Sequence, residues 1–213
     1  MPHRYVLGLY SLLERLTGEF PDVLFEGCCG GGGRFDAGML HYCPQIWCSD
    51  NTDAHDRTLI QYGTSFFYPI SAVGSHVSAV PNHQTGRTAS LKARGTVAMA
   101  GSFGYELDLN RLTGEEKAEV AQQVKEYKGY QKLIHGGRYY RLTNPFEGNM
   151  AAWAFISPDG REALVQGIVY RAASNVLRGR LRLAGLEREA RYRVGGKVYT
   201  GQALMTGGLL LPW

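Results

Sequence analysis

Short apolar runs and helix-like runs, four of each, follow one another between residues 5 and 134, and this pattern constrains the fold most strongly. Extended runs predict strands, and apolar residues at helical spacing predict helices. The predicted strands cover 22–28, 45–50, 66–80 and 102–109, and the predicted helices cover 5–19, 51–63, 88–101 and 113–134. Repeated strand–helix units favour a parallel sheet covered by helices. The first part of the chain is therefore predicted to be α/β.

A different pattern begins near residue 138. Short extended runs follow one another, separated by turn signals such as SPDG and VGGK rather than by helices. The runs cover 138–142, 150–157, 162–171, 175–186, 190–196 and 197–205. This pattern predicts two domains: an α/β domain over residues 1–137 and a small antiparallel, sandwich-like β domain over 138–213.

The composition is that of an ordinary globular protein. Of 213 residues, 44% are hydrophobic and 20% are charged, and the formal net charge is +4. No stretch has the roughly 18 uncharged apolar residues of a membrane span. The N-terminal stretch carries charges at Arg4 and Glu14 and has no small-residue cleavage site, so it makes a poor signal peptide. We expect a cytoplasmic protein with no membrane partner.

The cysteines are confined to one short region. Cys28, Cys29, Cys43 and Cys48 are the only ones in the chain, and none of them forms a C-x-x-C pair. A disulfide framework would spread its cysteines more widely, and structural zinc sites use closer ligand spacings. We expect reduced thiols, no metal site and no cofactor.

Arg178, Arg180 and Arg182 alternate with leucines in the stretch LRGRLRL. A period of two places the arginines on one face of a strand. Nucleic-acid-binding surfaces combine clustered positive charge with aromatic stacking platforms, whereas Glu187 and Glu189 dilute the charge here and no aromatic residue interleaves. The stretch therefore indicates a solvated sheet face and no nucleic-acid partner.

The stretch CCGGGGRFD follows the first predicted strand and places glycines at all of positions 30–33. Consecutive glycines cost much backbone entropy, so we expect either a close approach to the main chain or a turn that side chains forbid. A P-loop requires lysine and a hydroxyl residue after its last glycine, and a dinucleotide fingerprint requires the spacing G-x-G-x-x-G with an acid about 20 residues further on. Neither pattern fits, and the chain has no G-x-S-x-G motif to support a hydrolase serine.

The loops after the second and third predicted strands carry the other candidate groups. Asp50 ends a strand beside an aromatic residue, and Asp53 follows it. In one interpretation Asp50 or Thr52 caps the next helix and Asp53 is an acid of its first turn. In the other, Asp50 is a general acid at a strand end. His76 and His83 are similarly compatible with a structural hydrogen bond or with catalysis.

The motifs LFEGCCGGGGRFD, IWCSDNTDAHDR and GSHVSAVPNHQTGR closely resemble those of family 36 glycoside hydrolases, the bacterial and fungal α-galactosidases. The similarity continues through GSFGYELDL, GLEREARYRV and GQALM and spans essentially the whole chain. It implies a retaining hydrolase of terminal α-galactosides, of melibiose or raffinose type, built on a (β/α)8 barrel with a C-terminal β domain. In this resemblance Asp50 is the acid/base, Cys28 and Gly31 line the galactose pocket, and Trp47 walls it.

The resemblance also indicates what the chain lacks. The family nucleophile is the Asp of a KWD motif on an earlier barrel strand, and no KWD occurs here. The chain has four β/α units, whereas a closed barrel has eight. It is therefore predicted to be the second half of the barrel plus the C-terminal domain, and to be inactive alone. Cys29, Cys48, His41 and His55 stand where the family usually has other residues.

Two consequences follow for partners and for alternative functions. Asp36 and Asp53 are poor substitutes for the second carboxyl group that a retaining glycosidase needs. An open half-barrel has unpaired strand edges, which predicts homo-oligomerisation or association with the other half-barrel. The alternatives are a non-catalytic galactoside-binding or complementing subunit and a fragment of a raffinose-synthase-like transferase.

Overall fold

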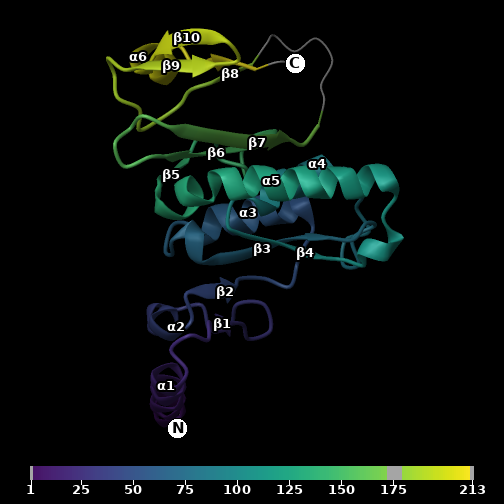
Figure 1. Cartoon of the computed structure of the whole chain (residues 1–213), viewed down its shortest axis with the longest axis vertical. Coiled ribbons are helices and arrows are strands. Elements are labelled where there is room, and N and C mark those ends of the chain that lie inside the picture. The colour runs from purple at the N-terminus through teal and green to yellow at the C-terminus, as the bar shows by residue number, and fades with distance from the viewer. Residues whose placement is uncertain (1, 172–178, 212–213) are drawn as a thin grey trace.

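The computed structural model describes residues 2–171 and 179–211. Its elements follow one another along the long axis of the molecule, from α1 at one end to the hairpin of β9 and β10 at the other (Figure 1). Within the described part of the chain, no helix combines the length and the apolar character that crossing a membrane requires.

Four parallel strands form the first sheet. β1 (Glu26–Gly27), β2 (Gln45–Trp47), β3 (Val73–Ser78) and β4 (Ser102–Glu106) pair in chain order, each with the next. The helices between and after them are α2 (Ala37–Tyr42), α3 (Ala54–Thr64), α4 (Leu91–Ala98) and α5 (Gly114–Gly136). Sequential parallel neighbours joined by helices are the arrangement of a (β/α)8 barrel, so the predicted α/β half-barrel is confirmed.

Local signals explain where the later helices begin. Ser90 caps α4 by accepting a hydrogen bond from the amide of Ala93. Thr113 and Glu116 form a capping box at the start of α5, with each side chain bonded to the other residue's amide. These caps are readable from the sequence, and both helices lie close to their predicted positions.

All four strand predictions for the first sheet were too long, since β2 and β4 also end three residues before their predicted ends. Within the predicted strand 22–28 only β1 pairs, and within 66–80 the pairing begins at Val73, after a short 3-10 helix, η1 (Ile70–Ala72). Pro69 has no amide proton for a strand ladder and precedes this turn. Helix α2 was not predicted; Asp36 caps it by accepting from the amide of Met39.

The C-terminal part contains antiparallel sheets, as predicted. β5 (Arg138–Arg141), β6 (Met150–Ile156) and β7 (Ala163–Val169) form one sheet, and β8 (Arg180–Leu181) pairs with β11 (Leu209–Leu210) and β9 (Arg191–Val194) with β10 (Lys197–Thr200). The extended run predicted over 197–205 was wrong in its second half, which is helix α6 (Gly201–Thr206) capped by Thr200.

The arginine stretch lies partly in this region. Arg178 is outside the described residues, while Arg180 and Arg182 are exposed and Leu181 and Leu183 are buried. The alternation predicted for the strand is therefore confirmed at the described positions.

Strand β6 connects the two parts of the structure. On one face, Trp153 and Phe155 join a core with Val73 and Val97 of the half-barrel. On the other face, Ala154 packs in a second core with residues of the C-terminal hairpins, among them Leu181, Leu183 and Leu204. Helix α1 (Pro2–Glu19) lies at the far end and buries only Leu13 within the helix.

Candidate active site

The glycine loop packs directly against the chain that follows β2. Gly30, Gly31 and Gly32 have positive φ angles of 55°, 74° and 96°, a region that favours glycine. A Cβ on Gly31 would lie 2.6 Å from the amide nitrogen of Asp50, and one on Gly32 would lie 2.5 Å from the carbonyl oxygen of Cys48. Both reasons expected for the glycines therefore hold: the turn is left-handed, and a neighbouring main chain approaches it closely.

The carboxyl group of Asp50 lies beside this loop. Its Oδ1 accepts a hydrogen bond of 3.0 Å from the indole Nε1 of Trp47, and the side chain is exposed. The interpretation in which Asp50 or Thr52 caps the following helix is wrong. Asp53 is the cap, accepting from the amides of His55 and Asp56 at 3.0 and 3.1 Å. The Asp50 carboxyl is thus free of helix capping and available for chemistry.

An open cavity of about 400 Å³ adjoins Trp47. Its lining brings together residues that follow or belong to the four parallel strands: Glu26, Cys28, Trp47, His76, Tyr105 and Glu106. Two of the predicted site residues, Cys28 and Trp47, line this cavity. Asp50 and Gly31 are not in its lining, but they pack against each other, and Asp50 is hydrogen-bonded to Trp47. The sequence interpretation did not single out Glu26, Tyr105 or Glu106.

The two candidate histidines differ in their surroundings. The ring of His76 stacks on Trp47, with 4.7 Å between ring centroids, and burial lowers the pKa of His76, although nearby carboxylates act against that shift. His83 is exposed and lies in the loop after β3, outside the cavity. Only His76 is therefore placed near the candidate site.

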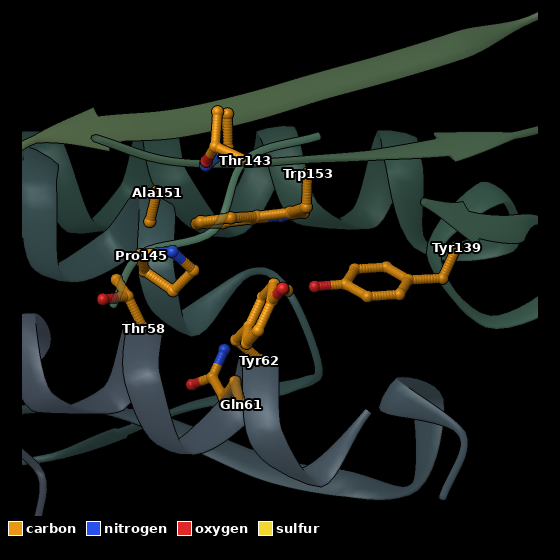
Figure 2. A pocket seen from close by; sticks show the side chains of 10 residues that line it. Thr58, Gln61, Tyr62, Tyr139, Thr143, Pro145, Ala151 and Trp153 are labelled. Carbon is orange, nitrogen blue, oxygen red and sulfur yellow. The ribbon is translucent and has the colours of Figure 1, made fainter. Parts of the chain in front are cut away.

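A second pocket lies between α3 and the sheet of β5 and β6. Figure 2 shows Tyr62, Tyr139 and Trp153 converging on it, with Gln61 and Thr58 projecting from α3. Its volume is about 10 Å³, which is room for about one water molecule. It cannot hold a sugar, whereas the open cavity beside Trp47 has a volume of about 400 Å³.

Arg57 is a site residue that sequence reasoning missed. It is only 2% exposed. Its guanidinium donates to the carbonyl oxygens of Ser49 (2.8 Å), Asn51 (2.8 Å) and Gly74 (3.0 Å), and its Cζ lies 4.4 Å from the centre of the Trp47 ring. Arg57 follows helix cap Asp53 by four residues, but nothing in that spacing distinguishes it from a surface arginine.

Arg87 fixes the loop after β3 to the start of α3. It bridges the carboxylates of Asp53 and Asp56, and the Thr85 hydroxyl donates to Asp53 at 2.8 Å. Burial acts to raise the pKa of Asp53, but hydrogen bonds from the Asp56 amide, Thr85 and Arg87 outweigh it, so the pKa lies below its ordinary value of 3.8. Asp53, His55 and Asp56 are close enough to share a metal ion. However, the guanidinium of Arg87 already bridges the two carboxylates, so the cluster is better suited to a structural role.

Replacing Arg87 with alanine is expected to destabilise the chain by about 1 kcal/mol at pH 7, because charge-assisted bonds to Asp53 and Asp56 are lost from a half-exposed side chain. Carboxylates whose pKa is lowered by folding stabilise above pH 3.8, and this stabilisation is lost as the pH falls through the lowered pKa. Urea unfolding should therefore show a lower free energy of unfolding for R87A than for the unsubstituted chain. This difference should shrink below pH 3.8. An equal difference at every pH would contradict this role, and R87K serves as the charge-retaining control.

Neither of the alternative carboxyl groups is placed to act as a nucleophile. Asp36 caps α2 and also accepts from the Tyr10 hydroxyl at 3.2 Å, while Asp53 caps α3 and pairs with Arg87. Each of these carboxylates is committed to holding a helix start. The expectation that neither substitutes for the second carboxyl group agrees with this geometry.

Comparison with known proteins decides the family. Residues 1–137 match the family model described as Melibiase, and residues 150–213 match the model of the glycosyl hydrolase family 36 C-terminal domain. The chain belongs to glycoside hydrolase family 36. The predicted fold, the C-terminal half of a (β/α)8 barrel followed by an antiparallel β region, is the corresponding part of this family's structures.

Its relatives in family 36 are glycosidases. The chain is 57% identical over 212 residues to alpha-galactosidase AgaA of Geobacillus stearothermophilus, covering 99% of this chain and 29% of that protein. It is 55% identical to the bifunctional alpha-galactosidase/sucrose kinase AgaSK of Mediterraneibacter gnavus, covering 100% of this chain and 23% of that protein. The chain therefore spans less than a third of the length of these relatives.

Solved family 36 structures match the fold over nearly the whole chain. An AgaA variant from Geobacillus stearothermophilus in complex with raffinose superposes with a TM-score of 0.97 at 56% identity, covering 99% of this chain and 30% of that one. The galactosidase domain of AgaSK gives a TM-score of 0.96 at 55% identity, with the same coverage of both chains.

Proposed function

We propose that this chain carries the acid/base part of the catalytic site of a retaining α-galactosidase. Its substrates are oligosaccharides that end in α-galactose, of the raffinose and melibiose type. The observation that carries the proposal is the placement of Asp50: its carboxyl group lies against the glycine loop, accepts a hydrogen bond from Trp47 of the cavity lining, and plays no part in capping α3. Acid/base residues of glycosidases need this combination of access to a sugar and freedom to exchange a proton.

In the proposed site, the galactose unit lies between the glycine loop and the cavity. Gly31 has no side chain, so its main chain comes within reach of the Asp50 region, and a sugar hydroxyl can approach the same backbone. Cys28 and Trp47 line the adjoining cavity and supply a thiol and an aromatic wall. Support for a raffinose-type substrate comes from the 56% identical AgaA variant, which was solved in complex with raffinose.

A retaining mechanism needs a second carboxyl group about 5–5.5 Å from the first, acting as nucleophile. We place this group outside the present sequence, on the other half of the barrel, because Asp36 and Asp53 are engaged as helix caps. The N-terminal part of the chain offers a surface for that half: Leu7, Leu12 and Leu24 are 53%, 50% and 85% exposed. Self-association of the chain would cover the same surface. The cytoplasmic location and the boundary between residues 137 and 138 stay predictions of the sequence.

The proposal is tested with a chimeric chain in which this sequence replaces the matching 212 residues of Geobacillus stearothermophilus AgaA. We expect the chimera to hydrolyse raffinose and p-nitrophenyl α-galactoside, and the isolated 213-residue chain to hydrolyse neither. Turnover by the isolated chain would contradict the need for an external nucleophile. A folded chimera that binds galactose without turnover would instead support the binding-protein alternative, and one that transfers galactose to a sugar acceptor would support the transferase alternative.

A further inference from the structure

Two side chains pack against the indole of Trp47. The guanidinium of Arg57 lies 4.4 Å from its ring centre, and the imidazole of His76 lies 4.7 Å away at an interplanar angle of 35°. A cation over an aromatic face is attracted by the ring quadrupole, and more strongly when it is shielded from water. Because Arg57 is almost fully buried, its contact with the ring is of the stronger kind. The ring plane of Trp47 is therefore fixed.

The guanidinium of Arg57 also fixes the loop that carries Asp50. Arg57 donates to the carbonyl oxygens of Ser49 and Asn51, which are the two residues on either side of Asp50 in the chain. A third bond, to the carbonyl oxygen of Gly74, ties this group to strand β3. The Trp47 ring and the Asp50 main chain are thus positioned against one side chain.

The N–H group at the edge of the Trp47 ring points at the carboxyl group of Asp50. An indole is a donor only, and the Nε1 of Trp47 donates to Oδ1 at 3.0 Å. Among residues 2–171 and 179–211, no second hydrogen-bond donor reaches this carboxyl group. One oxygen is therefore occupied by the indole, while the other is left for a ligand or for solvent.

We propose that Trp47 is a positioning residue for Asp50, with Arg57 and His76 holding its ring, and that Oδ2 is the oxygen that carries the catalytic proton. This inference rests on the proposed acid/base function of Asp50. As the Oδ2–H bond breaks, its proton passes to the glycosidic oxygen, which takes the electron pair of the breaking bond to the sugar. The nucleophilic carboxylate, outside this chain, forms the new bond to the sugar. The indole hydrogen bond to Oδ1 stabilises the negative charge left on Asp50.

This role is additional to that of a pocket wall, which the sequence resemblance implied for Trp47. A wall contributes its ring face to a sugar, whereas the positioning of Asp50 depends on the ring edge that carries Nε1. The important property of Trp47 is therefore its N–H group, which phenylalanine lacks.

The test follows the indole N–H resonances of the full 213-residue chain during a pH titration. Three tryptophans, Trp47, Trp153 and Trp213, give three such signals, and W47F identifies the first. We expect the Trp47 signal to shift with a single acidic midpoint, and this shift to disappear in D50N. Trp153 is the internal control, because its indole donates to the uncharged Gln166 side chain.

Two further variants separate positioning from simple packing. H76A removes the ring that packs against Trp47 and is expected to diminish the pH-dependent shift of the Trp47 signal. H76F keeps an aromatic ring at this position and should retain the shift. An unchanged Trp153 signal shows that each variant is folded. A Trp47 signal that does not move with pH, that moves equally in D50N, or that is insensitive to H76A would overturn the inference.

Failure of the positioning role can be distinguished from failure of the proposed function. If the chimera is active and needs Asp50 while the Trp47 signal is insensitive to Asp50, the function stands and the positioning role is wrong. If the chimera is folded but inactive, the proposed function is wrong, and the catalytic role of the Trp47–Asp50 pair fails with it even where the signal titrates.

Discussion

Replacing Asp50 with asparagine in the active chimera is expected to lower kcat for raffinose by about 10²- to 10⁴-fold, the usual contribution of a general acid/base. Asparagine keeps the size of the side chain and can still accept the Trp47 hydrogen bond through its amide oxygen. What it loses is the exchangeable acidic proton. The fall should be smaller for p-nitrophenyl α-galactoside, because a good leaving group needs little protonation.

Azide provides the decisive control for this variant. In a retaining mechanism the acid/base residue later activates water to release the sugar, and azide attacks without that help. Azide should therefore accelerate D50N and yield galactosyl azide, which a merely structural loss would not do. D22N is the matched control, because Asp22 is exposed and precedes β1. A D50N chimera with full activity on raffinose would refute the assignment.

Replacing Arg57 with leucine is expected to destabilise the isolated chain by about 3 kcal/mol or more. The change leaves the carbonyl oxygens of Ser49, Asn51 and Gly74 without their donor, and each buried unsatisfied group costs about 1–3 kcal/mol. Since small domains are stable by only about 5–15 kcal/mol, much of the stability of this region would be lost. Urea unfolding at pH 7 measures the effect.

Two control variants show how much of the loss of stability in R57L comes from the buried guanidinium. R15L makes the same chemical change on the exposed surface of α1 and should alter stability by less than about 0.5 kcal/mol. R57K keeps the charge but cannot reach three carbonyl oxygens at once, so its effect should lie between the two. Equal stability of R57L and R15L would mean that the buried guanidinium network contributes nothing.

The sequence predicted those features that depend on local pattern. The alternation of strands and helices, the glycine loop and the caps at Ser90 and Thr113 all leave a signature within a few residues. The glycine loop predicted either a close approach to the main chain or a turn that side chains forbid, but not that the neighbour would be the stretch from Cys48 to Asp50. The prediction that Asp50 and this loop belong to one site depended on the family resemblance.

The rest depends on contacts between residues that no local pattern connects. Arg57 reaches the carbonyl of Gly74 on another strand, and Arg87 reaches back to Asp53 across the loop after β3. Neither partner can be identified from spacing. One interpretation places the cap at Asp50 or Thr52, because the four successive residues at positions 50–53 are all of types that suit a cap. Only the path of the backbone selects Asp53.

Strand β6 has a consequence for how proteins of this kind can be recombined. One of its faces is shared with the helices around Asp50 and the other with the C-terminal hairpins. If the part of the chain after residue 137 is exchanged between relatives, a foreign β6 packs against the native helices. Its mismatched side chains would then leave gaps in the core between β6 and these helices. A junction placed before residue 1 leaves every one of these contacts intact. A graft that keeps β6 together with the residues packed on both of its faces should transfer the site as a whole.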